Sequence, residues 1–262
     1  SEEALREGLR AKTLDLLLFP KAPVANAPNI FTALERVFPA QHGSYILGPM
    51  LRITWGVPTI ITMDLGLLIE WGVRDRFIVL GRISAVLPNA DNDLLRLRMD
   101  VLGVVDFDQG TVAIDAVLVD SKLLDKFVLT GAMALRMRWT SPRSFALAVG
   151  GMHRSFTPPA GFPTLERLAL NLTTGSNPRL TCEAYFALTS NSVQFGAAAH
   201  LYAEGPMSFN VTGDAGFDVL IACAFNYEAH AAEFEKLGRV PVLKARMNPD
   251  LHMAGDLKNT GA

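Results

Sequence analysis

The sequence predicts a mainly β protein, a large antiparallel meander of about ten to eleven long amphipathic strands. Apolar and polar residues alternate over long stretches, most clearly from Met207 to Asn226, where every odd-numbered position is apolar or glycine. The loops between these stretches are short and rich in Gly, Pro, Asn and Asp, which favours antiparallel neighbours. Half of the 262 residues are hydrophobic and 19% are charged, so a large apolar surface has to be covered by something.

Residues 1–40 predict a helical segment in front of the sheet. Residues 1–19 have the spacing of a short amphipathic helix, and a proline-rich spacer follows at 20–28. Residues 29–39 predict a second short helix, with Asn29 as its N-cap. From about residue 45 the apolar period changes from near 3.6 to 2, and the β domain is therefore expected over residues 41–226.

Each predicted strand has one apolar face. The stretches are residues 59–71, 77–87, 94–107, 111–120, 127–139, 144–152, 166–175, 179–190, 192–204 and 207–226. A strand of a dozen residues is roughly 40 Å long, about twice the usual length. A sheet this tall with one apolar face must fold over itself, form a groove around something apolar, or close into a barrel. Residues 227–262 predict a C-terminal helix at 227–238 and a loosely ordered tail.

Three long phrases, in residues 29–70, 145–172 and 179–204, resemble a family of large bacterial proteins of unknown function that are rich in β-strands. The resemblance covers about residues 29–221. It implies a multi-strand β fold and a chain that is a piece or a short relative of a longer protein. The pattern departs after residue 222, where such proteins would continue with more long strands. No functional residue carries over, because the family has no assigned activity.

The charge and the apolar runs of the sequence indicate which partners and which location are expected. The 24 basic and 26 acidic residues give a net charge of −2, which predicts no binding to nucleic acid. The charged start lacks the apolar core of a signal peptide, and no run of about 18 apolar residues predicts a membrane helix, so a cytoplasmic location is favoured. Cys182 and Cys223 fall on apolar strand faces, which predicts buried free thiols rather than a disulfide.

No motif for catalysis, a cofactor or a metal is present, and the chain is predicted not to be an enzyme. His153 and Arg154, in a Gly- and Pro-rich loop, are the one loop candidate for binding, although shaping of the loop by its Gly and Pro residues is the favoured explanation. The carboxylate pairs Asp106/Asp108 and Asp214/Asp218 are interpreted as turn and surface residues. The arginine pairs Arg96/Arg98 and Arg136/Arg138 predict a solvated outer face.

The alternation leaves three explanations of the apolar face. The first is a scaffold that cups or encloses a hydrophobic ligand such as a lipid, without catalysis. The second is a structural or protein-interaction module of a larger assembly, which contacts its partner through the apolar face or an edge of the sheet. The third, ranked last, is a membrane-spanning β-barrel. The residues predicted to line the apolar face are Met133, Leu135, Trp139, Phe195, Phe209 and Phe217.

Overall fold

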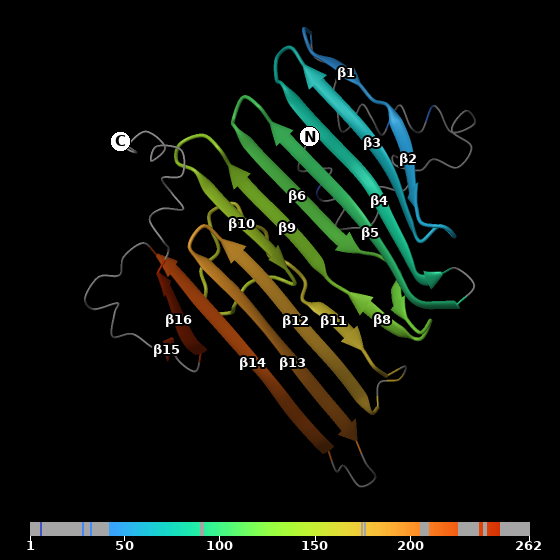
Figure 1. The fold of residues 1–262 in the computed structure, drawn as a ribbon, viewed down its shortest axis with the longest axis vertical. Helices are drawn as coiled ribbons and strands as arrows, with labels where there is room; N and C mark the ends of the chain where they lie inside the picture. Colours follow the sequence, from blue (N-terminus) through green and yellow to red (C-terminus); the bar gives the residue numbers. More distant parts are fainter. Residues whose placement is uncertain are drawn as a thin grey trace, which may run out of the picture.

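The fold is a single β-sheet. The computed structural model describes Arg6, Pro28, Thr32 and residues 42–89, 92–173, 175, 177–204, 210–224, 236–237 and 240–246. Within these residues sixteen strands join into one sheet (Figure 1), which confirms the predicted mainly β, antiparallel fold. The predicted N-terminal helices and most of the predicted helix at 227–238 lie outside the described residues. No helix among the described residues has the length and apolarity needed to cross a membrane.

The strands differ widely in length, from two residues to fifteen. They are β1 (Tyr45–Leu47), β2 (Met50–Trp55), β3 (Ile61–Trp71), β4 (Arg76–Asn89), β5 (Asn92–Asp106), β6 (Thr111–Leu118), β7 (Ser121–Leu123), β8 (Phe127–Thr130), β9 (Ala132–Arg138), β10 (Ser144–Val149), β11 (Leu168–Asn171), β12 (Arg179–Thr189), β13 (Ser192–Glu204), β14 (Asn210–Ala224), β15 (Lys236–Leu237) and β16 (Val240–Arg246).

The sheet is open. Its order is β1-β3-β4-β5-β6-β9-β10-β12-β13-β14-β16-β15, with β2, β7, β8 and β11 attached beside this path. Neighbours are antiparallel except β14 and β16, which run parallel. Among the described residues no pairing joins the two ends of this order. The long diagonal strands of Figure 1 therefore form one extended layer.

All ten stretches predicted from the period of two contain strands. Stretch 127–139 is divided at Gly131 into β8 and β9. The sequence analysis missed β1, β2, β7, β15 and β16, because these are too short for alternation to stand out or lie in the tail. The helix predicted at 227–238 is wrong at its end, where Lys236–Leu237 form β15, and the tail is ordered as β16 over Val240–Arg246. The proposed domain limits stay predictions.

In the middle of the sheet, the chain leaves the sheet after β10 and returns to it at β11. Strands β10 and β11 run in the same direction along the same side of β12, with β10 opposite residues 186–189 and β11 opposite residues 181–184. The chain leaves this line at Gly150 (φ +68°), where a Cβ atom would lie 2.5 Å from the carbonyl oxygen of Ala184, so glycine is required there. Residues 150–167, here named the excursion loop, leave the sheet and return to it at Leu168.

Two neighbouring rows of residues show what the two faces of the sheet are like. The first row crosses nine strands and is apolar throughout: Leu67, Val79, Gly103, Ile114, Leu135, Leu147, Leu188, Val193 and Ile221. Apart from Gly103, these residues are partly exposed. The next row lies on the opposite face: Gly66, Leu80, Leu102, Asp115, Ala134, Ala148, Ala187, Gln194 and Leu220.

In this second row, every residue from Leu80 to Leu220 is at most 8% exposed. The core therefore lies on the face that carries the charged residues. The excursion loop covers part of it: Met152 packs on Ala146, Ala148 and Ala187, and Phe156, Phe162 and Leu165 pack around them. We call this side the covered face and the other side the open face.

Candidate functional site

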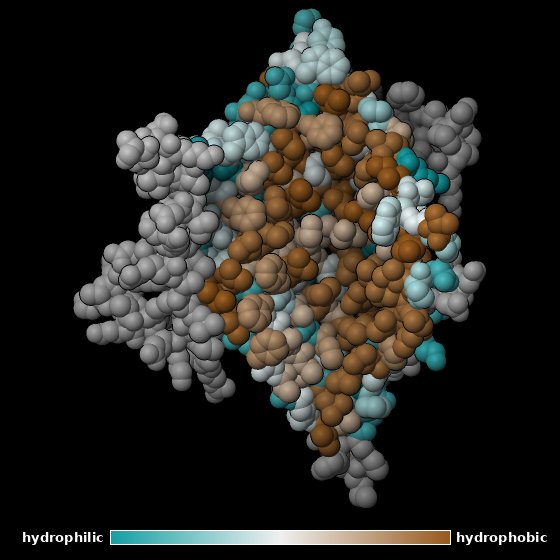
Figure 2. Space-filling model, in the orientation of Figure 1, coloured by the Kyte–Doolittle hydropathy of each residue, from teal (hydrophilic) through white to brown (hydrophobic). Residues whose placement is uncertain are grey.

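The open face is a broad apolar surface. Figure 2 looks onto it and shows hydrophobic side chains running without a break across most of the sheet. Its exposed members include large aromatic residues that a soluble monomer ordinarily buries. Trp55 on β2 is 65% exposed, and Phe217 on β14 is 57% exposed. A continuous apolar surface of this extent is typical of a ligand-binding or protein-binding site.

The open face is hollowed over strands β12 to β14. A cavity of about 580 Å³ lies there, within the range of small-molecule sites, which is about 300–1,000 Å³. Small residues form its floor. Cys182, Ala199 and Ala215 are opposite one another on β12 to β14, and Ala184 and Ala197 are opposite each other on β12 and β13. Its walls are Leu129, Leu168, Leu170 and Phe217.

The structure brings most of the predicted apolar residues to the open face. Met133 and Leu135 lie on β9, and Phe195 and Phe217 lie on β13 and β14 with their rings edge to face, 6.4 Å between centroids. Trp139 follows β9 and is 39% exposed. Phe209 lies outside the described residues. Of the described members of this set, Phe217 alone borders the cavity, and the set did not include the alanines of the floor.

Cys182 also lies at the cavity floor. It is a free thiol, as predicted, but half-buried rather than buried, because it belongs to the open face. The side chain of Cys223 is not among those described.

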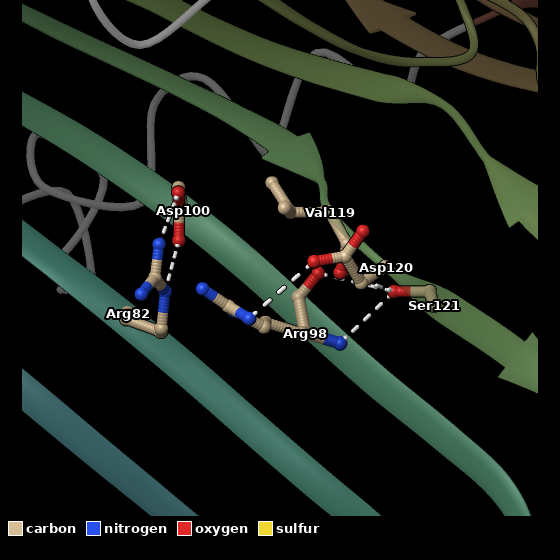
Figure 3. A network of polar contacts seen from close by, with 6 residues as sticks. All are labelled: Arg82, Arg98, Asp100, Val119, Asp120 and Ser121. Carbon is tan, nitrogen blue, oxygen red and sulfur yellow. Dashed lines mark hydrogen bonds and ion pairs between the residues drawn. The ribbon is translucent and has the colours of Figure 1, made fainter. Parts of the chain in front are cut away.

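The covered face is held by ion pairs between neighbouring strands. Arg52, Asp64, Arg82 and Asp100 are opposite one another on β2 to β5, so their charges alternate. Arg82 donates two hydrogen bonds to Asp100, of 2.6 and 2.8 Å (Figure 3), and the Asp100 side chain is only 4% exposed. Hydrogen bonding with Asp64 raises the pKa of Arg52. Opposite charges facing each other across strands stabilise one register over others.

Arg136 contradicts the predicted solvated outer face. It donates two hydrogen bonds to Asp115, of 2.8 and 3.0 Å, and the two side chains are 18% and 10% exposed. Arg6 also lies 3.5 Å from the Asp115 carboxylate. The prediction failed because alternation separates two faces without saying which one is covered. Arg96 and Arg138 are exposed, as expected of a solvated face.

Ser121 bridges the break between β6 and β7. Its buried hydroxyl accepts a hydrogen bond from the Arg98 amide (2.9 Å) and lies 3.1 Å from the Arg98 carbonyl oxygen, to which it donates (Figure 3). The break itself has Asp120 at φ +48°, and the Asp120 carboxylate lies 3.5 Å from Arg98. These contacts hold β6 and β7 end to end beside β5.

The loop candidates His153 and Arg154 lie at the covered face, where a polar cluster has formed. His153 is 6% exposed, its amide donates to the Gln194 side chain (3.0 Å), and its Nδ1 accepts from the Ser155 amide (3.1 Å). The other ring nitrogen, Nε2, lies 4.0 Å from the Asp218 carboxylate. Arg154 is exposed and borders a cavity of about 180 Å³ between the loop and the sheet.

Tyr185 and Asp218 meet in this cluster above a glycine. Tyr185, Gly196 and Asp218 are opposite one another on β12 to β14, and a side chain at Gly196 would collide with both neighbours. Burial, and then the nearby Asp218 carboxylate, raise the pKa of the Tyr185 hydroxyl. Arg167 lies 4.2 Å above the Tyr185 ring and donates to the carbonyls of Gly150 and Met152 (2.9 Å each). The cluster fastens the excursion loop to the sheet.

The carboxylate pairs contact backbone amides of turns or histidine side chains. Asp106 accepts from the Gln109 amide (2.7 Å) and Asp108 from the Asp75 amide (3.0 Å), as expected of turn residues. Asp214 lies 2.6 Å from His200. Within the part of the chain that the structure describes, no group of three or more His, Cys, Asp or Glu residues is arranged to hold a metal.

Comparison with known proteins gives a family. Residues 1–255 match a family of unknown function (DUF6603). The match confirms the resemblance predicted from residues 29–221 and extends it toward both ends. No curated protein and no solved structure matches the chain.

Proposed function

The chain belongs to the DUF6603 family, whose function is unknown, and we propose that it is a non-enzymatic β scaffold that binds an extended apolar ligand on its open face. An acyl chain of a lipid is the ligand class that fits best. The observation that carries this proposal is the contrast between two adjacent rows of the sheet, one apolar and partly exposed, the other buried.

The open face has apolar area that a bound ligand can cover. The covered face already contains the fully buried side chains, among them Ile78, Leu102 and Gln194. The open face therefore retains apolar area that folding has not used. Covering each further 100 Å² of it is worth about 2.5 kcal/mol, from which the cost of immobilising the ligand is subtracted.

The cavity over β12 to β14 favours a slender ligand. Its floor of Ala184, Ala197, Ala199 and Ala215 lies lower than its walls because alanine side chains are short, and the walls are leucine and phenylalanine. A hydrocarbon chain needs no polar partner, and the open-face row through this floor offers none. The continuity of the open face beyond the cavity supports a ligand longer than the cavity itself (Figure 2).

The first test is to purify the protein without detergent, extract it with organic solvent and identify the extract by mass spectrometry. Stoichiometric lipid is expected. An empty protein would contradict the proposal and favour the alternative, a structural or interaction module.

Paired variants locate the ligand. Ala199→Phe fills the floor of the cavity, and Ala85→Phe places the same side chain on the open face of β4, outside the cavity. Binding of tritiated palmitate is expected to weaken at least tenfold in Ala199→Phe and to change less than twofold in Ala85→Phe. Equal effects of the two substitutions would show that the cavity is not the binding site.

A further inference from the structure

Among the described residues, part of one edge of the long strand β14 is unpaired. On one side β13 pairs with it from Asn210 to Ala222. On the other side β16 pairs only with Leu220–Ala224, and no other described strand pairs with Asn210–Val219. Every residue from Val211 to Asp218 is exposed. A strand edge of this kind presents a row of free backbone amides and carbonyls that can pair with another strand.

The opposite edge of the sheet is built differently. There β1 and β2 both pair with β3, as two short strands separated by Gly48 and Pro49. Short edge strands, prolines and charges are the usual protections against pairing, and β2 carries Arg52. Between Asn210 and Val219, β14 has no proline and no lysine, and its charges are Asp214 and Asp218.

Both carboxylates of this edge are near histidines of the same chain. Asp214 lies 2.6 Å from His200, and Asp218 lies 4.0 Å from His153. Both lie on the covered side of the sheet, so the open side of the edge strand is uncharged, with Val211, Gly213, Ala215, Phe217 and Val219. On its open side, this edge therefore has no charge that would oppose pairing with another strand.

We infer that β14 pairs with β14 of a second copy of the chain, antiparallel, to form one continuous sheet across a twofold axis. An axis perpendicular to the sheet keeps both open faces on one side and pairs residues whose numbers sum to an even total. This partner goes beyond the proposed function and does not depend on it, because backbone pairing needs no lipid.

Side-chain complementarity selects the register of this pairing. An axis at Asp214 would place Asp214 opposite itself, and an axis at Gly216 would place Asp214 opposite Asp218, both of which are unfavourable. An axis at Ala215 places Phe217 opposite the partner's Gly213, Val211 opposite the partner's Val219 and Asp218 opposite the partner's Thr212. An aromatic side chain across from a glycine is a favourable pair at an edge. This register spans residues 211–219 and stops where β16 begins to pair.

Cysteine cross-linking tests the register. In a Cys182→Ser, Cys223→Ser background, Ala215→Cys lies on the axis and is expected to form a disulfide-linked dimer under mild oxidation. Val211→Cys, which faces the partner's position 219, is the matched control and should stay monomeric in denaturing electrophoresis. The combination of Val211→Cys with Val219→Cys should cross-link again. Cross-linking of Ala215→Cys no greater than that of Val211→Cys would overturn the proposal.

Light scattering distinguishes a dimer that pairs through the β14 edge from a dimer in which two open faces stack. Ala215→Lys puts two ammonium groups on the axis and is expected to give a monomer with an unchanged circular dichroism spectrum. Ile53→Lys puts the same charge on the open face at the opposite edge, where Ile53 is 44% exposed, and should leave the dimer intact. Loss of the dimer in both variants, or a monomeric wild type, would overturn the inference. Palmitate binding is measured on the wild type and on Ile53→Lys, because Ala215 borders the cavity and Ile53 does not, and it reports on the proposed function separately.

Discussion

The two faces of this sheet differ in a way that reverses the usual arrangement of an amphipathic β protein. On the covered face, Asp100 is buried together with Leu80 and Leu102, and the side chain of its partner Arg82 is 12% exposed. On the open face, side chains one position away along the same strands are apolar and partly exposed. The charged, covered face therefore stabilises the fold and its register, and the apolar, open face is left to contact something else.

The largest expected effect comes from breaking a buried ion pair of the covered face. Asp100→Ala removes the carboxylate that accepts two hydrogen bonds from Arg82, whose side chain is 12% exposed, and a loss of about 3 kcal/mol in the free energy of unfolding is expected. Asp64→Ala, in the same row, removes the partner of Arg52, whose side chain is 68% exposed, and should lower the free energy of unfolding much less. Urea denaturation followed by circular dichroism measures both. Equal losses would contradict the claim that the Arg82–Asp100 pair stabilises the fold more than the exposed Arg52–Asp64 pair.

Two leucines on β5 compare the faces directly. Leu102 is fully buried on the covered face, and Leu97 is partly exposed on the open face. Leu102→Ala should lower the free energy of unfolding by about 2–5 kcal/mol, because it leaves a cavity in the core. Leu97→Ala should lower it by about 1 kcal/mol, since little of its environment is enclosed. Urea midpoints of the two variants check this, and a larger loss from Leu97→Ala would place the core on the other face.

Tyr185 makes the stability of the covered face depend on pH. Its pKa is raised in the folded protein, so its contribution to stability is complete below the unfolded value of about 10 and is lost as the pH rises toward the folded value. Stability of the wild type should therefore fall above pH 10, and Tyr185→Phe should fall less. At pH 7 this variant should differ by about 1 kcal/mol or less, because the hydroxyl has no hydrogen-bond partner among the described residues. Urea midpoints at pH 7 and pH 11 give both values, and parallel losses in the two proteins would exclude this role of Tyr185.

The smallest expected effect on stability is that of Phe217→Asp. Phe217 is 57% exposed on the open face, so the free energy of unfolding should change by about 0.5 kcal/mol or less. Palmitate binding should nevertheless be lost, because a charge then lies at the wall of the cavity. Leu220→Asp, on the covered face of the same strand and 8% exposed, is the contrasting variant and should prevent folding. A thermal melt of each distinguishes the outcomes, and unfolding of Phe217→Asp would assign Phe217 to a core.

The sequence predicted much of this fold because strand alternation is local. The period of two located ten stretches and put Met133, Leu135, Phe195 and Phe217 on one face. It could not say which face is covered, because that depends on the excursion loop and its packing of Met152 on the sheet. The meeting of Tyr185 and Asp218 over Gly196 depends on the register of three strands. The strand at Val240–Arg246 depends on pairing with β14, and its own seven residues predict it poorly.

The most direct test of the central claim is photolabelling with a diazirine analogue of palmitate, followed by mass spectrometry of the labelled peptides. The structure predicts adducts on open-face residues of β12 to β14, such as Cys182, Ala199 and Phe217, and none on the covered-face residues Tyr185 and Gln194 next to them. Adducts on the covered face, or labelling that excess unlabelled palmitate does not reduce, would contradict the claim that the open face is the ligand-binding surface.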